Sequence, residues 1–371
     1  MHIGVPKETK VHEYRVGMTP ESVRELVEDG HTVTVETGAG GGINASDADY
    51  RDAGARIADG PGDVFAVSDM IVKVKEPSAD ERAMLREGQI LFTYLHLAPD
   101  PEQTRDLIAS GAVCIAYETV TDSDGGLPLL KPMSQVAGRM SIQVGAHCLE
   151  KEAGGRGILL GGVPGVMPGK VVVIGGGVVG FNAAQMAAGL GAGTIVLDRN
   201  PTVLEQLSNH FEARIRTRFS SRSNLADSVR TADLVIGAVL VAGAKTPKLV
   251  TRAMLSEMKP GAVLVDVAVD QGGCFETSRP TSHADPTFVV DGIVHYCVAN
   301  MPGAVPRTST YALNNVTLPH ISSIAQHGWQ EACRRNPHLA NGLNVLAGKV
   351  THPAVADALG YDLTALEDVL A

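Results

Sequence analysis

The sequence predicts an α/β protein with two domains, each a mostly parallel sheet covered by helices. Three observations support this fold class. Short apolar segments alternate with helical segments along most of the chain, which is typical of parallel strands joined by crossover helices. A glycine-rich turn follows one of these apolar segments and opens a second α/β region. The chain has 371 residues, enough for about two domains of common size.

The first third of the chain supplies the elements of the first domain. A helix is predicted to begin at Pro20, because Thr19 can cap it and proline suits the first helical position, and to end at Gly30. Ser46 opens another helix, with Asp49 as a weak capping-box partner. We predict strands at Thr32–Glu36, Met70–Val74, Ile90–Leu95 and Val113–Tyr117, and a helix at Pro101–Ser110 that ends before Gly111.

The second α/β region begins after a long helix, predicted near Met133–Glu152 because small and apolar residues recur there at helical spacing. Strands are predicted at Val171–Ile174, Thr194–Leu197, Ile215–Arg218, Leu234–Ala238, Ala262–Val267 and His295–Val298. From Pro306 the tail returns to helices and is too short for a core of its own. We therefore predict a discontinuous first domain, residues 1–128 completed by 305–371, and a second domain of residues 129–304.

Composition excludes several classes of protein. The net charge of −10 disfavours a nucleic-acid partner, because phosphate binding needs clustered Lys and Arg. Five scattered cysteines without Cys-x-x-Cys spacing predict buried, reduced thiols and a cytoplasmic location rather than disulfides or a zinc site. The N-terminus has no apolar run of signal-peptide length. Val171–Leu197 lacks charge but contains seven glycines, so we interpret it as a buried βαβ unit and not as a membrane span.

The glycine-rich turn Gly175-Gly176-Gly177-Val178-Val179-Gly180 matches the pattern G-x-G-x-x-G. It follows an apolar strand and opens a helix of small residues, which is the context of a dinucleotide site. Gly175 permits the tight turn, Gly177 lets the backbone approach a pyrophosphate, and Gly180 lets helix and strand pack closely. The helix N-terminus offers unpaired N–H groups to the phosphates. The turn thus predicts a Rossmann-like, dinucleotide-binding domain.

Asp198 ends the next predicted strand, at the spacing expected for the residue that binds the ribose hydroxyls. Its carboxylate would repel a 2′-phosphate and therefore favours NAD over NADP, although the adjacent Arg199 is able to meet such a phosphate. Two alternatives stay open at this point: a glycine-rich turn that binds no nucleotide, and a flavin, which uses the same fingerprint.

Polar residues at strand ends predict a substrate site, because ligands of open α/β sheets bind outside the carboxyl ends of the strands. Lys75 and His96 each end a predicted strand, and Asp270 ends the run Ala262–Val269. Arg15 lies in the loop after the first strand. A base, an acid and two cations around a catalytic cleft between the domains would suit an anionic keto or amino acid. Each residue also has a plain interpretation. In that interpretation Lys75, which shares its face with Lys73, is an exposed strand end, and His96 is a surface histidine. Asp270 is then a turn residue and Arg15 is a solvated cation.

Motifs spread over nearly the whole chain carry a family resemblance. They are Val5-Pro6-Lys7-Glu8, Glu13-Tyr14-Arg15-Val16, Lys73-Val74-Lys75-Glu76-Pro77, Phe92-Thr93-Tyr94-Leu95-His96-Leu97-Ala98, Met133-Ser134-Gln135-Val136-Ala137-Gly138 and Asp266–Gly273. With them the chain resembles the alanine dehydrogenase and transhydrogenase α-subunit family. Asn300-Met301-Pro302 and Thr308–Leu313 are similar to its alanine dehydrogenase members. The resemblance implies two Rossmann-like domains and NAD-dependent interconversion of L-alanine with pyruvate and ammonium.

The same resemblance implies a role for each candidate residue. Arg15 would clamp the substrate carboxylate and Lys75 would contact the carboxylate and the carbonyl oxygen. His96 would be the general acid and base, and Asp270 the second catalytic group. The positions that match cofactor contacts of the family are Ser134, Val178, Val179, Asp198, Ser220, Val239, Leu240, Val267, Asp270, Asn300 and Met301.

One site departs from the family's pattern. Some relatives bind magnesium through a carboxylate and a histidine one helical turn apart, whereas this chain has Ser323 and His327, and we therefore predict no metal. The resemblance also implies a homo-hexamer, through the long helix near Met133–Glu152, with small-molecule substrates and no membrane or nucleic-acid partner. Two other functions stay open: an NAD-binding transhydrogenase α-type subunit, and a non-enzymatic NAD sensor.

Overall fold

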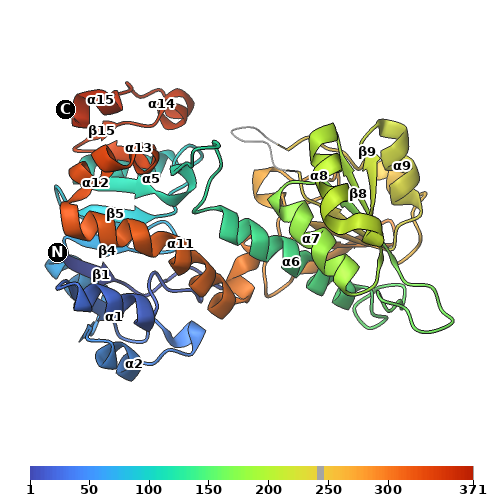
Figure 1. Ribbon diagram of the computed structural model, residues 1–371, viewed down its shortest axis with the longest axis horizontal. Coiled ribbons are helices and arrows are strands. Elements are labelled where there is room, and N and C mark those ends of the chain that lie inside the picture. Colours follow the sequence, from blue (N-terminus) through green and yellow to red (C-terminus); the bar gives the residue numbers. More distant parts are fainter. Residues whose placement is uncertain (240–245, 371) are drawn as a thin grey trace. The chain divides into compact units, whose positions relative to one another are not determined.

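The computed structural model of the chain describes residues 1–239 and 246–370. The chain divides into two compact units (Figure 1). Unit 1 comprises Met1–Met133 and Gly303–Ala371, and unit 2 comprises Ser134–Pro302. Each unit contains one sheet with helices on it, and most neighbouring strands are parallel. The predicted fold class, two α/β domains with parallel sheets, is therefore confirmed.

The sheet of unit 1 has eight strands in the order β15-β14-β6-β5-β4-β1-β2-β3. Their bounds are β1 His2–Val5, β2 Thr32–Glu36, β3 Arg56–Ala58, β4 Met70–Val72, β5 Ile90–Thr93, β6 Val113–Ala116, β14 Leu343–Leu346 and β15 Lys349–Val350. The first six are mutually parallel, whereas β14 runs antiparallel to β6 and β15 antiparallel to β14. The C-terminal segment therefore completes this sheet with two strands, where the sequence predicted only helices.

Helices cover both faces of this sheet. They are α1 Pro20–Glu28, α2 Asp47–Asp52, α3 Pro61–Val67, α4 Ala79–Met84, α5 Pro101–Ser110, α11 Pro306–His327, α12 Trp329–Arg335, α13 Pro337–Ala340, α14 Pro353–Leu359 and α15 Leu366–Leu370. Successive side chains of a strand point to opposite faces. Accordingly, Met70 and Val72 of β4 pack in a core with α1, α11 and α12, while Ile71 packs in a second core with α3 and α5.

The predicted helix starts are confirmed by their caps. The side chain of Thr19 accepts a hydrogen bond from the backbone of Ser22 at the start of α1. Ser46 and Asp49 form a complete capping box at the start of α2. The helix Pro101–Ser110 has the predicted bounds, and Gly111 follows it in the left-handed conformation, with φ +67°. Local side-chain chemistry therefore fixes these boundaries.

Unit 2 has a seven-stranded sheet in the order β12-β13-β11-β10-β7-β8-β9. The strands are β7 Lys170–Ile174, β8 Gly193–Asp198, β9 Arg216–Phe219, β10 Leu234–Gly237, β11 Val263–Asp266, β12 Thr287–Val290 and β13 Ile293–Tyr296. All neighbours are parallel except β12, which is antiparallel to β13. The helices are α6 Lys131–Cys148, which begins in unit 1, α7 Val178–Gly189, α8 Pro201–Phe211, α9 Arg222–Arg230 and α10 Arg252–Leu255.

The uncharged segment Val171–Leu197 forms β7, α7 and β8, as predicted. In the part of the chain that the structure describes, no helix combines the length and apolar character that crossing a membrane requires. The last predicted strand of this region, His295–Val298, is displaced, since β13 is Ile293–Tyr296.

Candidate functional site

The glycine turn lies where the order of the strands in unit 2 reverses. The chain proceeds from β7 to β8 and β9 on one side and then returns to β10 on the other side of β7. Such a switch point, at the carboxyl ends of parallel strands, is where open α/β sheets bind ligands. Gly175 follows β7 with φ +100°, a conformation that favours glycine. The turn therefore has the position and backbone of a nucleotide site.

The glycines of the turn differ in what surrounds them. A Cβ at Gly180 would lie 1.8 Å from the carbonyl oxygen of Gly175, so close packing of helix on turn requires glycine there. A Cβ at Gly176 would meet side chains of α8, 2.7 Å from Val203 and 2.8 Å from Leu207. At Gly177 a Cβ would meet no described atom within 4 Å. No described part of the fold requires glycine at 177, whereas the close approach of a phosphate to the start of α7 would require it.

Asp198 is held against the glycine turn. One oxygen of its carboxylate accepts the N–H of Gly176 at 2.7 Å, and the other accepts the N–H of Asn200 at 2.8 Å. The backbone N–H of Ser220 donates to the carbonyl oxygen of Asp198 at 2.9 Å. Each carboxylate oxygen keeps a lone pair that can accept from a ribose hydroxyl. The half-buried carboxylate is thus fixed in orientation before any ligand arrives.

The other predicted cofactor residues of unit 2 lie around the same edge. Val239 follows β10, and its side chain would be 3.0 Å from a Cβ at Gly175. Val267 follows β11, and its N–H donates to Gly237 at the end of β10. Asn300, with φ +59°, and the buried Met301 follow β13, the neighbour of β11.

Two hydrophobic residues and one serine complete this set. Val178 and Val179 begin α7 directly after the turn. Ser134 is half-buried in α6, one turn before Gly138. A Cβ at Gly138 would lie 2.3 Å from the carbonyl oxygen of Val179, so α6 packs closely on the start of α7. Leu240 lies outside the described residues. The described residues therefore fit a dinucleotide at the turn.

Gly177→Ala tests this interpretation. Because the added Cβ meets no described atom, we expect an unchanged melting temperature, but affinity for NAD reduced by about tenfold or more, since the methyl occupies the path of the pyrophosphate. Differential scanning fluorimetry and titration calorimetry measure the two quantities. Gly180→Ala is the matched contrast and should lose both stability and binding. If Gly177→Ala kept full affinity for NAD, the turn would not be the phosphate site.

Three of the four predicted substrate residues meet at one edge of the sheet of unit 1. Arg15 lies in the loop after β1, Lys75 follows β4 and His96 follows β5. These strands are consecutive and parallel in the sheet, so their carboxyl ends lie together. The hydroxyl of Thr93 donates to the carbonyl oxygen of Lys75 at 3.0 Å and joins the two strand ends. Asp270 belongs to unit 2.

Arg15 is buried, with 3% of its side chain exposed, and is paired with Glu13. Its Nε donates to one oxygen of Glu13 at 2.7 Å and its Nη2 donates to the other at 2.5 Å. Nη1 lies 3.1 Å from the sulfur of Met133. Burial opposes the charge, but the hydrogen bonds and charge of Glu13 raise the pKa of Arg15 above its usual value. The pair keeps a charged, planar guanidinium oriented at this edge.

Lys73 and Lys75 have different environments although the sequence places them on one face. Lys73 is 1% exposed and forms ion pairs with Glu81 at 2.7 Å and Glu8 at 3.5 Å. Glu8 also accepts the N–H groups of Val74 at 2.7 Å and of Lys75 at 3.3 Å. Lys75 is half-buried. The buried triad Glu8–Lys73–Glu81 therefore fixes the backbone from which the Lys75 side chain extends.

His96 has a strained backbone, with φ +51°, that a neighbouring carboxylate holds. Glu118 accepts the N–H of His96 at 2.5 Å and that of Leu95 at 3.1 Å, and lies 3.7 Å from Nδ1 of the ring. The ring stacks on Tyr94, with centroids 5.9 Å apart, and about half of the side chain, 48%, is exposed. Sequence analysis missed Glu118, although it follows β6 at the same edge and the strand-end rule could have found it.

Asp270 lies in the short 3₁₀ helix η4, Val269–Gln271, and is exposed. The loop that carries it closes around Asp266, a fully buried carboxylate. Asp266 accepts the N–H groups of Ala268 at 3.1 Å and Cys274 at 2.8 Å and the hydroxyl of Ser278 at 2.5 Å. Burial raises its pKa, and these hydrogen bonds counteract the rise. Asp266 therefore holds the shape of this loop, and the sequence showed it only as part of a motif.

Ser323 and His327, at the position where the family resemblance would place magnesium, make contacts within the protein. Nδ1 of His327 lies 3.0 Å from the carbonyl oxygen of Ser323, and its Nε2 lies 2.8 Å from Nη1 of Arg335. A guanidinium at this distance opposes a bound cation. Among residues 1–239 and 246–370, no three His, Cys, Asp or Glu side chains gather as a metal site would require.

Comparison with known proteins assigns the family. Residues 4–137 match the model of the alanine dehydrogenase/PNT N-terminal domain, and residues 141–353 match the model of the C-terminal domain. The chain belongs to the alanine dehydrogenase/PNT family. The motif-based resemblance is therefore confirmed.

The relatives cover this chain from end to end. An alanine dehydrogenase of Halomonas elongata is 60% identical over 98% of both chains, and one of Mycobacterium tuberculosis is 54% identical over 100% of both. A solved L-alanine dehydrogenase has a TM-score of 0.94 and 51% identity over 100% of both chains. A transhydrogenase of Sinorhizobium meliloti has a TM-score of 0.82 and 26% identity over 95% of this chain and 100% of its own.

Proposed function

We propose that the chain is an NAD-dependent L-alanine dehydrogenase, which interconverts L-alanine with pyruvate and ammonium. The family catalyses this reaction with NAD, and relatives up to 60% identical over nearly their full length carry the name. The observation that carries the proposal is that Lys75 and His96 follow two adjacent parallel strands and that Arg15 lies in the loop after the third. Two cations and an imidazole suit a small carboxylic acid with a reacting oxygen or nitrogen beside it.

NAD, when bound, accepts a hydride from the substrate carbon or returns it there as NADH. Gly175, Gly177 and Gly180 would hold its pyrophosphate and Asp198 its ribose. The supporting geometry is the open space at Gly177 and the carboxylate of Asp198 fixed beside the N–H of Gly176. A carboxylate there accepts from both ribose hydroxyls and repels a 2′-phosphate, so NAD is preferred over NADP.

The cations of unit 1 bind and orient the substrate. Arg15 binds the substrate carboxylate through its planar guanidinium, and the pair with Glu13 holds that plane. Lys75 contacts the carboxylate and the carbonyl oxygen, whose developing negative charge its ammonium stabilises. The triad Glu8–Lys73–Glu81 fixes the backbone of Lys75, because Glu8 accepts the N–H of Lys75, and it does not itself contact the substrate.

Proton transfer is assigned to His96 and Asp270. The imidazole of His96 gives a proton to the reacting oxygen or takes one from it, a task for which histidine is the side chain most often used. Glu118 holds the ring's backbone and faces Nδ1. Asp270 assists the water and ammonia that add to or leave the substrate carbon.

An assay of NADH oxidation tests the function. With pyruvate as substrate, absorbance at the NADH band should fall only when ammonium is present, and glyoxylate or larger keto acids define the specificity. Oxidation without ammonium would instead indicate a hydroxy-acid dehydrogenase. The likeness to a transhydrogenase favours hydride exchange between nucleotides as the second candidate, and pyruvate-independent transfer to an NAD analogue would identify it.

We also propose a homo-hexamer in the cytoplasm, with contacts through α6. The family resemblance supports the assembly, and the mass of the particle in solution tests it. All five cysteines are free and buried, which suits a reducing compartment.

A further inference from the structure

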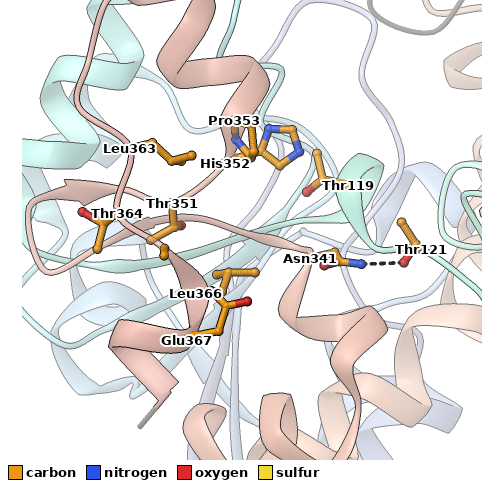
Figure 2. A pocket seen from close by; sticks show the side chains of 11 residues that line it. Thr119, Thr121, Asn341, Thr351, His352, Pro353, Leu363, Thr364, Leu366 and Glu367 are labelled. Atoms are coloured by element: carbon orange, nitrogen blue, oxygen red, sulfur yellow. Dashed lines mark hydrogen bonds between the residues drawn. The ribbon is translucent and has the colours of Figure 1, made fainter.

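Unit 1 contains a cavity of about 390 Å³ remote in sequence from the residues discussed above, except that Thr119 follows Glu118 (Figure 2). Its walls come from the end of β6, the α13–β14 turn, the β15–α14 connection and the segment that leads into α15. The volume is within the range of small-molecule pockets, at its lower end. The C-terminal segment thus lines a partly open pocket large enough for a metabolite.

The hydroxyl protons of Thr119 and Thr351, which both line the cavity, are used within the protein. The hydroxyl of Thr351 donates to the carbonyl oxygen of Leu343 at 2.9 Å. That of Thr119 donates to the carbonyl oxygen of Ala116 at 3.3 Å and accepts from Asn344 at 2.7 Å. Asn341 uses its amide N–H on the hydroxyl of Thr121, at 2.8 Å, as Figure 2 shows. With these protons committed to protein acceptors, the oxygens present lone pairs to an occupant.

His352 adds an unsatisfied atom to this wall. Its Nδ1 is buried and has no hydrogen-bond partner among the described residues. Burial lowers the pKa of His352, so the ring is neutral near pH 7 and is able to accept a hydrogen bond. A buried polar atom without a partner is costly, and a rotation of the ring that turned this nitrogen toward a donor of the occupant would remove that cost.

The charge of the lining favours a cation. Glu367 contributes a carboxylate, and no Lys or Arg is present among the residues that line the cavity. Glu118 lies close enough to act on the charge of His352. Leu363 and Leu366 provide apolar contact for a short hydrocarbon stem. An ammonium group satisfies acceptors on several sides at once, because it carries three donors.

We propose that this cavity is a binding site for a small aliphatic ammonium compound, held by Glu367, the hydroxyl oxygens of Thr119 and Thr351, and the imidazole of His352. Its lining contains no residue of the strand-end cluster of Arg15, Lys75 and His96, and the proposal does not depend on the proposed reaction.

Titration calorimetry on the full-length protein tests the site with propylammonium as the probe. Propanol and propionate are the neutral and anionic analogues of the same shape. We expect propylammonium to bind about tenfold more tightly than propanol, because a charge-assisted hydrogen bond is about twice as strong as a neutral one, and propionate not to bind. Density for the amine in crystals soaked with it should lie within the cavity.

Glu367→Gln should weaken propylammonium about tenfold and leave propanol unchanged, since only the charge of one wall is removed. Asp368→Asn is the matched control: it lies on the same short helix, does not line the cavity, and should bind as the unmodified protein does. Absence of binding, equal affinity of Glu367→Gln and the unmodified protein, or tighter binding of propionate than of the amine would overturn the proposal.

Discussion

His96→Ala is expected to lower kcat by about 10²–10⁴-fold in both directions of the reaction, while the affinity for NAD stays unchanged. The imidazole is the group to which proton transfer at the strand-end cluster is assigned, whereas carboxylates hold the buried Arg15 and Lys73 charged. The nucleotide turn lies in the other unit and keeps its contacts. Stopped-flow and steady-state measurements of NADH absorbance give kcat, and a fluorescence titration gives the affinity for NAD.

His147→Ala serves as the control for this variant. His147 is 71% exposed on α6 and pairs with Glu150, so its removal should change neither quantity. Should His96→Ala turn over at nearly the rate of the unmodified protein, proton transfer would have to be assigned elsewhere, with Asp270 as the remaining candidate.

Part of the site could be predicted from the sequence by the rule that ligands of open α/β sheets bind at the carboxyl ends of the strands. Lys75 and His96 were found because a parallel sheet gathers the carboxyl ends of its strands, whatever the side chains are. The rule does not say which of two neighbouring lysines is exposed. Lys73 is the buried one of the two because it forms ion pairs with Glu81 and with Glu8, which lies 65 residues away in the sequence. Periodicity in one segment carries no information on such a partner.

The C-terminal strands show the same limit. β14 pairs antiparallel with β6, and its register shifts between Leu343 and Val345. A four-residue segment of this kind forms a strand because an open sheet edge is available to it, and that edge is built from a distant part of the chain. The caps at Thr19 and Ser46 could be predicted because all their partners lie within three residues. Glu13 is equally local to Arg15, so this pair was available in the sequence.

Lys73→Met is expected to lower the melting temperature by about 6–20 °C at pH 8, because breaking a buried ion pair costs about 3–5 kcal/mol. The methionine fills the volume of the lysine stem but leaves two buried carboxylates, Glu8 and Glu81, without their cation. Lys75→Met is the matched control, because it makes the same substitution at a lysine that is only half-buried. It should lose activity while keeping its melting temperature. Scanning calorimetry and the NADH assay separate the two roles.

The loss of stability in Lys73→Met should also depend on pH with a defined sign. Burial already raises the pKa of Glu8, and Lys73 counteracts that rise. Without the lysine the folded protein holds a proton on this carboxyl at a pH where the unfolded chain has released it. Stability therefore falls as pH rises above the usual range of a glutamate, and the deficit relative to the unmodified protein is smaller near pH 5 than at pH 8. A deficit of the same size at pH 5 and pH 8 would show that Lys73 acts by packing and not as the counter-ion of Glu8. The support that this triad gives to Lys75 would then have to come from the hydrogen bonds of Glu8 alone.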